Sequence, residues 1–232
     1  MKAAAVIAAG GKGVRMGGAT RKQYLFLDGK PVLARSAALF LDHGAVDQVV
    51  LVVPAGDIES TAELLRPYCP SGSYKLVEGG ATRQDSINNG LAALQPEADL
   101  ICVHDAARPL ASRDLLDSLL ESALRYGAAV PVITLSDTAK EVDRAGFVVS
   151  TPPREALRLV QTPQVFRRDI ITNAYRNAYR DGLAATDDAA LVELSGNPVA
   201  TVPGELSNLK ITSPRDLDLA SFWLEREKEE GI

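Results

Sequence analysis

Basic side chains surround a glycine-rich segment near the start of the chain. The apolar run Ala3–Ala8 leads into the glycine-rich residues 9–17, which include Arg15, and Lys22 follows soon after. A strand that ends in glycines brings backbone N–H groups close to a phosphate chain, because no Cβ atoms stand in the way. Lysine and arginine then supply the positive charge that phosphates require. The segment therefore predicts a nucleoside triphosphate site at the end of a β-strand.

Two common nucleotide-binding motifs do not fit this segment. A Walker A loop requires serine or threonine after its Gly-Lys pair, whereas Gly13 follows Gly11 and Lys12. A dinucleotide-binding loop requires a small residue at its sixth position, which Met16 occupies here. The pattern thus disfavours a P-loop ATPase and a nicotinamide-dependent enzyme. Taken alone, the segment also fits an ordinary glycine-rich loop between a strand and a helix.

A carboxylate and a guanidinium follow another apolar run, Leu100–Val103. Asp105 stands at the expected carboxyl end of this strand, where a metal or a ligand hydroxyl is commonly held. Arg108, three residues later, has the forked geometry that binds phosphate. A structural Asp–Arg turn explains the pair equally well.

Other polar segments have simpler explanations when each is considered alone. Gly79–Ser86 opens like a helix whose free N–H groups attract anions or base carbonyls, although a capping box explains it without a ligand. Residues 161–166 and 185–189 are typical of turns and helix caps. Lys210 falls in a predicted short strand, Leu209–Ile211, whose polar positions are typical of a solvated face.

The composition narrows the class of protein. The 232 residues carry a net charge of −5, which argues against a nucleic-acid-binding surface. No apolar stretch is long enough to span a membrane, and we interpret the short apolar start as a strand rather than an export signal, which predicts a cytoplasmic protein. Cys69 and Cys102 are too few for a disulfide framework, and the two histidines, His43 and His104, show no zinc-binding spacing.

Strand-like and helix-like segments alternate along the chain. This alternation predicts an α/β fold with a mainly parallel central sheet, helices on both faces, and ligands outside the carboxyl ends of the strands. The expected strands are Ala3–Ala8, Gln48–Val53, Tyr74–Val77, Leu100–His104, Ala128–Ile133 and Val199–Val202. The expected helices are Val32–Leu41, Ile58–Leu65, two that are capped by Thr82 and Ser112, Ile170–Tyr179, Asp187–Leu194 and one that begins at Ser213.

The pattern breaks after Pro131. Asp137–Val142 and Phe147–Ser150 resemble two short strands that residues 144–146 join as a hairpin. The hairpin has little apolar core of its own, so it fits an arm that packs on another subunit and a solvated surface hairpin equally well. We expect one domain over residues 1–232, with the hairpin arm at about residues 136–155.

Taken together and in order, these segments resemble the 2-C-methyl-D-erythritol 4-phosphate cytidylyltransferases of the non-mevalonate isoprenoid pathway. The resemblance extends from Ala5 to about Leu219. It rests on the glycine-rich loop with Arg15-Met16, Lys22-Gln23-Tyr24, Gly80–Ser86, His104–Pro109, Asp137-Thr138, Arg154, Thr162-Pro163-Gln164, Thr186-Asp187 and Asn208–Thr212. One departure is Ala9-Gly10-Gly11, where members commonly show Ala-Ala-Gly, and this exchange of small residues preserves a loop that works through its backbone.

The resemblance implies a single Rossmann-like nucleotidyltransferase domain, a protruding β-hairpin arm and a homodimer in which the arm completes the partner's site. It implies CMP transfer from CTP to methylerythritol 4-phosphate, release of pyrophosphate, and a requirement for Mg²⁺. The positions that hold CTP match Ala9, Gly10, Gly11, Gly80, Ser86 and Ala106, and the cations on the triphosphate match Arg15 and Lys22. Groups at the second substrate and the metal match Asp105 and Arg108, and the acceptor pocket matches Thr138, Arg154, Thr162, Thr186 and Lys210.

The acceptor is a phosphate monoester, mostly dianionic at neutral pH because its second pKa is about 6, so it needs no strong general base. Two alternatives stay open. A ribitol-5-phosphate cytidylyltransferase would run the same reaction on another acceptor, although those enzymes tend to carry a bulkier residue where this chain has Ala107. A non-catalytic nucleotide-binding module would share the fold, although binding alone does not require both Arg15 and Lys22.

Overall fold

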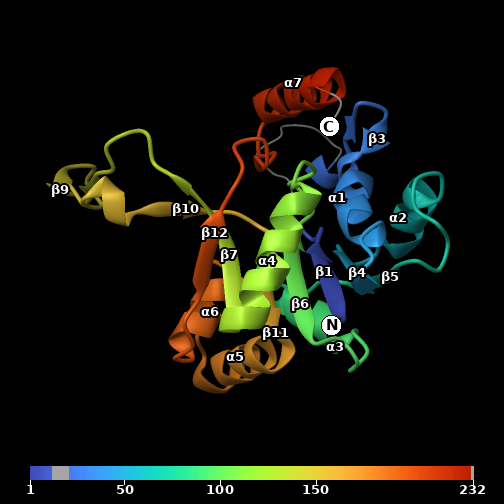
Figure 1. The fold of residues 1–232 in the computed structure, drawn as a ribbon, viewed down its shortest axis with the longest axis horizontal. Coiled ribbons are helices and arrows are strands. Elements are labelled where there is room, and N and C mark those ends of the chain that lie inside the picture. The colour runs from blue at the N-terminus through green and yellow to red at the C-terminus, as the bar shows by residue number, and fades with distance from the viewer. Residues whose placement is uncertain (12–20, 231–232) are drawn as a thin grey trace.

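The computed structural model describes residues 1–11 and 21–230, and Arg15 lies outside the described residues. Its centre is an eight-stranded sheet with helices on both sides (Figure 1). The strands of this sheet are β1 (Ala3–Ala8), β4 (Val46–Val53), β5 (Lys75–Glu78), β6 (Leu100–Asp105), β7 (Ala128–Thr134), β10 (Arg158–Val160), β11 (Gln164–Arg167) and β12 (Ala200–Pro203).

The predicted mainly parallel sheet is confirmed. Strands β5, β4, β1 and β6 lie side by side in that order, and all are parallel. Strand β12 is parallel to β7, whereas β11 runs antiparallel between β6 and β7, and β10 is antiparallel to β7. The carboxyl ends of β1 and β6 therefore meet at one edge of the sheet, with Ala8 beside Asp105.

Alternate residues of the central strands pack against opposite layers of helices, as the two-residue period of a strand requires. The helices are α1 (Val32–Leu41), α2 (Ile58–Leu65), α3 (Arg83–Ala92), α4 (Arg113–Tyr126), α5 (Arg168–Asp181), α6 (Asp188–Leu194) and α7 (Pro214–Glu230). Ala5 and Ile7 of β1 belong to the apolar cluster with α1, α2 and α4. Ala4 and Val6 belong to the cluster with α3, α5 and α6. The sheet is thus buried on both faces.

The helix caps that the sequence predicts are present in the structure. The Ser112 hydroxyl accepts a hydrogen bond from the Leu115 N–H at 3.0 Å and caps α4. Helix α4 ends at Gly127, whose φ of +94° is the left-handed conformation that glycine adopts without steric cost. Thr82 and Asp85 form a complete capping box at the start of α3.

Several segments differ from the prediction, among them β10, which the sequence did not predict. Leu209–Ile211 forms no strand. No neighbouring strand pairs with it, and Ile211 packs instead with α7 in a third apolar cluster. Residues 164–167, predicted as turn and cap chemistry, form β11. Its short apolar core, Val165 and Phe166, is inserted between two longer strands, so neighbouring strands rather than local pattern determine its conformation.

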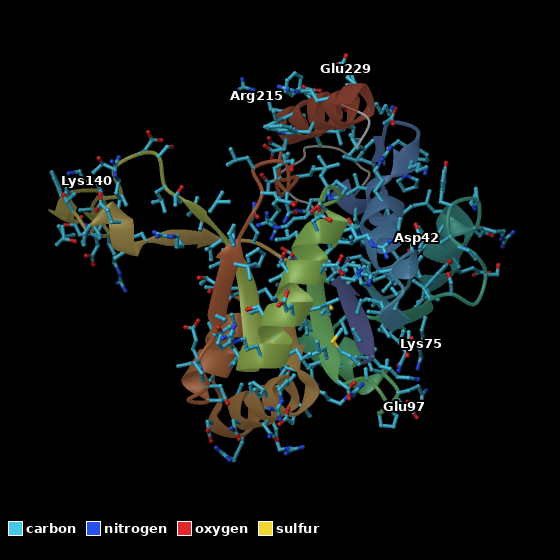
Figure 2. The ribbon with its side chains drawn as sticks, viewed as in Figure 1. Asp42, Lys75, Glu97, Lys140, Arg215 and Glu229 are labelled. Atoms are coloured by element: carbon cyan, nitrogen blue, oxygen red, sulfur yellow. The ribbon has the colours of Figure 1, made fainter. Side chains whose placement is uncertain are left out.

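The hairpin lies apart from the main sheet. Strands β8 (Glu141–Val142) and β9 (Val148–Ser150) pair antiparallel with each other only. Residues 140–151 are all exposed, and the segment projects far to one side of the molecule, where Figure 2 labels Lys140. Among the described residues, no helix is long and apolar enough to cross a membrane.

Candidate active site

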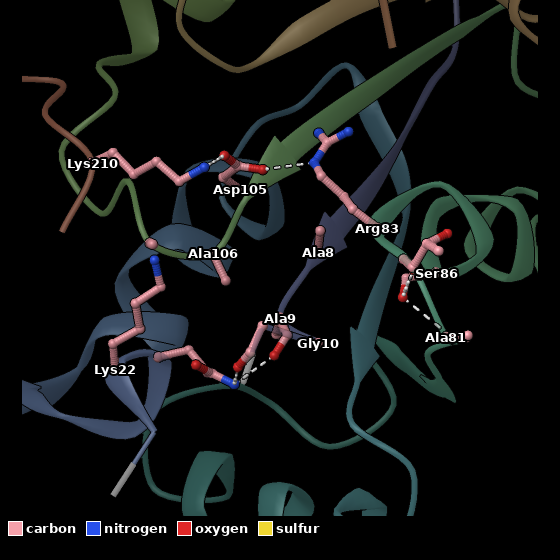
Figure 3. A pocket seen from close by; sticks show the side chains of 15 residues that line it. Ala8, Ala9, Gly10, Lys22, Ala81, Arg83, Ser86, Asp105, Ala106 and Lys210 are labelled. Atoms are coloured by element: carbon pink, nitrogen blue, oxygen red, sulfur yellow. Dashed lines mark hydrogen bonds and ion pairs between the residues drawn. The ribbon is translucent and has the colours of Figure 1, made fainter. Parts of the chain in front are cut away.

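A cavity of about 440 Å³ opens at the carboxyl ends of β1 and β6 (Figure 3). The amino end of α3 and the loop that carries Lys210 complete its wall. It is lined by Ala8, Ala9, Gly10, Gly11, Lys22, Gln23, Gly80, Ala81, Thr82, Arg83, Ser86, Asp105, Ala106, Ala107 and Lys210. The structure therefore brings together most of the residues that the sequence assigned to a nucleotide site.

Backbone contacts hold the chain that leaves β1. The Ala9 N–H donates to Val52 O at 2.7 Å, and the Gln23 amide donates to Ala9 O at 2.5 Å. Gly10 and Gly11 follow directly, and a Cβ atom on Gly11 would meet nothing within 4 Å. Residues 9–11 thus present mainly backbone to the cavity, which suits close approach of a phosphate chain.

The start of α3 forms a second backbone wall. The Gly80 N–H donates to the Ser86 hydroxyl at 3.1 Å, and that hydroxyl donates to Thr82 O at 2.8 Å. A Cβ atom on Gly80 would lie 2.3 Å from the Cβ of Asp85, so only glycine fits without displacement. The N-terminal N–H groups of such a helix favour anions and carbonyl oxygens.

Asp105 is held between two cations. Its Oδ2 lies 2.6 Å from Lys210 Nζ and its Oδ1 lies 3.3 Å from Arg83 Nε, as Figure 3 shows. Burial raises the pKa of the Asp105 carboxyl, but the charges of Arg83 and Lys210 outweigh it, so the pKa falls well below the usual value. Asp105 is therefore a stable anion at neutral pH.

Arg83 links this carboxylate to a second one. Its Nη2 donates to Asp188 Oδ2 at 2.8 Å, and the Tyr175 hydroxyl donates to Asp188 Oδ1 at 2.5 Å. Burial disfavours the charged guanidinium, yet the carboxylates of Asp188 and Asp105 more than offset this and raise the pKa of Arg83. The sequence alone assigned Arg83 no role, because a local capping motif accounts for its segment and its partner Asp188 lies far along the chain.

Lys22 approaches the cavity from a different side than Arg83. It begins the short 3-10 helix Lys22–Tyr24, and its Nζ donates to Ile211 O at 3.0 Å. Lys210 is the residue just before Ile211, so Lys22 binds the segment of chain that carries Lys210. The cavity thus contains two lysines and one arginine around a single described carboxylate. This excess of positive charge suits a polyanionic ligand.

Thr162 and His104 lie behind Asp105 in the interior. The Asp105 N–H donates to Thr162 Oγ1 at 3.0 Å, and Thr162 Oγ1 lies 3.0 Å from His104 Nδ1. His104 Nε2 lies 2.9 Å from Arg108 O. Burial lowers the pKa of His104 to about 4, so the ring is neutral at pH 7.

Besides Thr162, four predicted site residues do not line the cavity of their own chain. Arg108 is directed inward, where its Nη1 donates to Asn208 O at 2.8 Å. Thr186 is exposed just before α6. Thr138 and Arg154 are exposed at the base of the arm, and Arg154 Nη1 donates to Ser136 O at 3.1 Å. Arg15 lies outside the described residues, so its predicted role stays a prediction.

The parallel sheet, the glycine-rich strand end and the cationic cavity together define a nucleotidyltransferase of the Rossmann-like α/β class. Comparisons with known proteins identify the family. The family model for 2-C-methyl-D-erythritol 4-phosphate cytidylyltransferase, IspD, matches residues 3–226. A relative of that name from Pelotomaculum thermopropionicum is 48% identical over 222 residues, covering 94% of this chain and 92% of the relative. Another from Symbiobacterium thermophilum is 45% identical, covering 96% of this chain and 92% of the relative.

Solved structures of proteins with the same activity in their names also match this chain. The 4-diphosphocytidyl-2C-methyl-D-erythritol synthase from Anaerococcus prevotii matches with a TM-score of 0.84 at 30% identity, covering 97% of this chain and 98% of that one. The 2-C-methyl-D-erythritol 4-phosphate cytidylyltransferase from Thermus thermophilus matches with a TM-score of 0.80 at 38% identity, covering 97% of this chain and 100% of that one. The chain therefore belongs to the 2-C-methyl-D-erythritol 4-phosphate cytidylyltransferase family and is a cytidylyltransferase.

Proposed function

We propose that the cavity at the ends of β1 and β6 transfers CMP from CTP to 2-C-methyl-D-erythritol 4-phosphate and releases pyrophosphate. One observation supports the assignment of this reaction to the cavity. Lys22 and Lys210 reach the same space from distant parts of the chain, beside an anionic Asp105 and two glycine-opened backbone walls. Such a site binds a triphosphate and has positive charge left for a second phosphorylated substrate.

The two backbone walls suit the two ends of CTP. The segment Ala9–Gly11 follows a strand and has no bulky side chain, so it suits the triphosphate. The amino end of α3 offers helix N–H groups, which suit the carbonyl and ring nitrogen of cytosine. The Ser86 hydroxyl, which accepts from the Gly80 N–H and donates to Thr82 O, holds this wall in place. Ala106 also lines the cavity, and its small side chain leaves space for the ribose.

The reaction needs charge stabilisation more than proton transfer. A phosphate oxygen of the acceptor forms a bond to the α-phosphorus of CTP, and the bond from that phosphorus to the bridging oxygen of pyrophosphate breaks. The acceptor phosphate is already largely dianionic at neutral pH. Asp105, the one acid that lines the described part of the cavity, has a lowered pKa and is a poor base. Lys22 and Lys210 instead reduce the repulsion between two polyanions and stabilise the charge that develops on the leaving group.

The residues at the cavity fit a Mg²⁺ ion of the kind that substrate phosphates help to hold. Among the described residues, no cluster of three or more His, Cys, Asp or Glu side chains could hold a metal ion without substrate. Mg²⁺ at nucleotide sites commonly uses one or two carboxylates, several waters and substrate phosphates, and Asp105 supplies such a carboxylate. The ion would neutralise phosphate charge at the reacting centre.

The arm supports a two-fold homodimer that completes the acceptor side of the site. Val142, Phe147, Val148 and Val149 are each between 57% and 72% exposed, so a hairpin without a core leaves four apolar side chains in solvent. At its base, the described side-chain partners of Arg154 are the exposed Ser136 and Glu155. An isologous dimer would cover apolar side chains of both arms and bring each Arg154 to the partner's cavity.

A pyrophosphate-release assay tests the proposed function. It crosses CTP, UTP, ATP and GTP with 2-C-methyl-D-erythritol 4-phosphate and ribitol 5-phosphate. We expect turnover with CTP and methylerythritol phosphate to exceed every other pair. Equal or faster turnover with ribitol 5-phosphate would favour the ribitol enzyme, and no turnover with any pair would favour a non-catalytic module.

A further inference from the structure

Two buried residues behind Asp105 form a continuous chain of hydrogen bonds that the mechanism above does not use. We propose that His104 and Thr162 are positioning residues, which hold Asp105 and the Lys210 loop in the arrangement that CMP transfer requires. The proposal rests on the proposed function for its kinetic part only. His104 is fully buried and Thr162 is 5% exposed, and neither lines the cavity.

The hydrogen-bond partners determine which atom donates at each step of this series of hydrogen bonds. Arg108 O can only accept a hydrogen bond, so His104 Nε2, 2.9 Å away, must carry the proton. In the neutral ring Nδ1 is then an acceptor, and the Thr162 hydroxyl donates to it at 3.0 Å. Thr162 Oγ1 in turn accepts from the Asp105 N–H at 3.0 Å. The Thr162 hydroxyl proton is therefore committed to His104.

These hydrogen bonds hold both ends of the turn that carries Asp105. The turn closes with the Arg108 N–H donating to Asp105 O at 3.0 Å. His104 binds the Arg108 end through Nε2 and the Asp105 end through Thr162. The ring also packs against Phe40 with 5.4 Å between ring centroids, which restricts its rotation. A displaced turn would displace the Asp105 carboxylate.

The same threonine is tied to the other member of the ion pair. Thr162 O accepts from Asn208 Nδ2 at 2.9 Å, and Asn208 precedes Lys210 by two residues. Asn208 is completely buried, so this contact anchors the loop that brings Lys210 to Asp105. Thr162 thus connects to Asp105 by its hydroxyl and to the Lys210 loop by its carbonyl.

Nitrogen NMR of the wild-type protein tests the proton order without any enzyme assay. The chain has only two histidines, so ¹⁵N-histidine labelling gives two ring systems that the His104→Asn variant assigns. We expect neutral His104 with its proton on Nε2. In Thr162→Val the Nδ1 resonance of His104 should move, whereas His43, which contacts Asp117, serves as the unchanged internal control. A proton on Nδ1, or no shift in Thr162→Val, would overturn the proposal.

Two matched pairs of variants test the positioning role. In His104→Asn the amide oxygen takes the place of Nδ1, so this variant keeps the acceptor for Thr162. In His104→Gln the amide nitrogen takes the place of Nε2, so this variant keeps the donor to Arg108 O. Thr162→Ser keeps the hydroxyl, and Thr162→Val removes it with little change in shape. We expect His104→Gln and Thr162→Val to lose roughly ten- to a hundredfold in kcat, because a small displacement of a reacting group costs on this scale.

The partner variants separate positioning from general damage. His104→Asn and Thr162→Ser should lose less than their counterparts at comparable melting temperatures, and KM for CTP should stay near the wild-type value in all four folded variants. Losses that follow melting temperature alone, or equal losses within each pair, would refute the positioning role. If the wild type shows no transferase activity, the proposed function fails while the NMR result still judges the hydrogen-bond chain.

Discussion

The wall of the cavity and the hairpin arm hold their charged side chains in opposite ways. At the cavity, Asp105 is 8% exposed and takes hydrogen bonds from Lys210 and Arg83. On the arm, residues 140–151 are all exposed, and Arg154 has no described contact with the cavity of its own chain. The first set is fixed by the core of one chain, whereas the second is presented outward.

We expect the two regions to serve the reaction in different ways. Groups that stabilise developing charge act best when they are already in place, since no reorganisation is then needed during the reaction. The cavity wall meets that condition within a single chain. The arm carries the exposed residues that the family resemblance assigns to the acceptor phosphate, so we expect it to pack against a second subunit.

The largest expected effect concerns Lys22. Lys22→Ala should lower kcat on the order of 10²–10³-fold, the usual cost of removing one preorganised electrostatic contact, and change CTP binding much less. Steady-state kinetics together with CTP binding by calorimetry measure the two effects separately. Lys75→Ala is the matched control, because Lys75 is exposed on β5 at the amino edge of the sheet, where Figure 2 labels it. Retention of more than about a tenth of wild-type kcat would contradict the assigned role of Lys22.

The next effect is complementation between two impaired chains, measured at a low concentration of the acceptor. Arg154→Ala should raise KM for the acceptor by roughly ten- to a hundredfold, because an arginine–phosphate contact is charge-assisted and bidentate. In a mixed dimer of Lys22→Ala and Arg154→Ala chains, one of the two sites receives an intact Lys22 and an intact Arg154. Mixing the two proteins should therefore restore part of the activity.

The complementation needs proof that the chains exchange. Differently tagged chains that are co-purified show whether mixed dimers form. If mixed dimers form and are no more active than the separate variants, Arg154 acts in the site of its own chain or has a structural role. The cavity wall and the arm would then not be divided between subunits.

A glycine at the cavity gives an effect on both stability and binding. Gly80→Ala introduces a Cβ atom 2.3 Å from the Cβ of Asp85, so the start of α3 must shift. We expect a loss of about 1–3 kcal/mol in the free energy of unfolding, as for other overpacked sites, and a higher KM for CTP. Gly44→Ala is the control, because its Cβ would meet nothing within 4 Å. Equal unfolding free energies for the two variants in urea would refute this tight packing at Gly80.

The parallel strands of the central sheet were predicted well because each contains a short run of apolar residues. The apolar run Ala3–Ala8 is local, and so are the Ser112 cap and the Gly127 end of α4, so each could be identified within one window. Strand β11 could not be identified in this way, because its four residues adopt a strand only by pairing with the neighbouring strands β6 and β7. Local pattern therefore predicted the parallel core but missed the antiparallel strands β10 and β11.

The candidate site divides in the same way. The glycines and Asp105 were identified because each follows a strand directly. Arg83 was not assigned a role, since its contact with Asp188 joins residues 105 positions apart. Lys210 was placed on a strand in the residue-by-residue interpretation, whereas the packing of Ile211 against α7 turns this loop toward the cavity. Such contacts exist only after the chain has folded.

The smallest effect on the stability of a single chain is expected at Phe147, on the arm. Its side chain is 72% exposed and makes no contribution to the three apolar clusters of the described residues. Phe147→Ser should therefore change the free energy of unfolding of the isolated chain by less than about 0.5 kcal/mol. Phe40→Ala, at a fully buried position, should cost about 3–5 kcal/mol and provides the contrast.

The same substitution should nevertheless weaken the dimer. A protein that is stabilised by association melts at a temperature that rises with its concentration, because the partner acts as a ligand of the folded state. We expect this dependence in the wild type and a weaker dependence in Phe147→Ser, with both proteins converging at high dilution. Sedimentation velocity over the same concentrations should show the variant dissociating first. If Phe147→Ser instead lowers the melting temperature equally at all concentrations, the arm is stabilised by its own chain, and the contrast with the cavity wall does not hold.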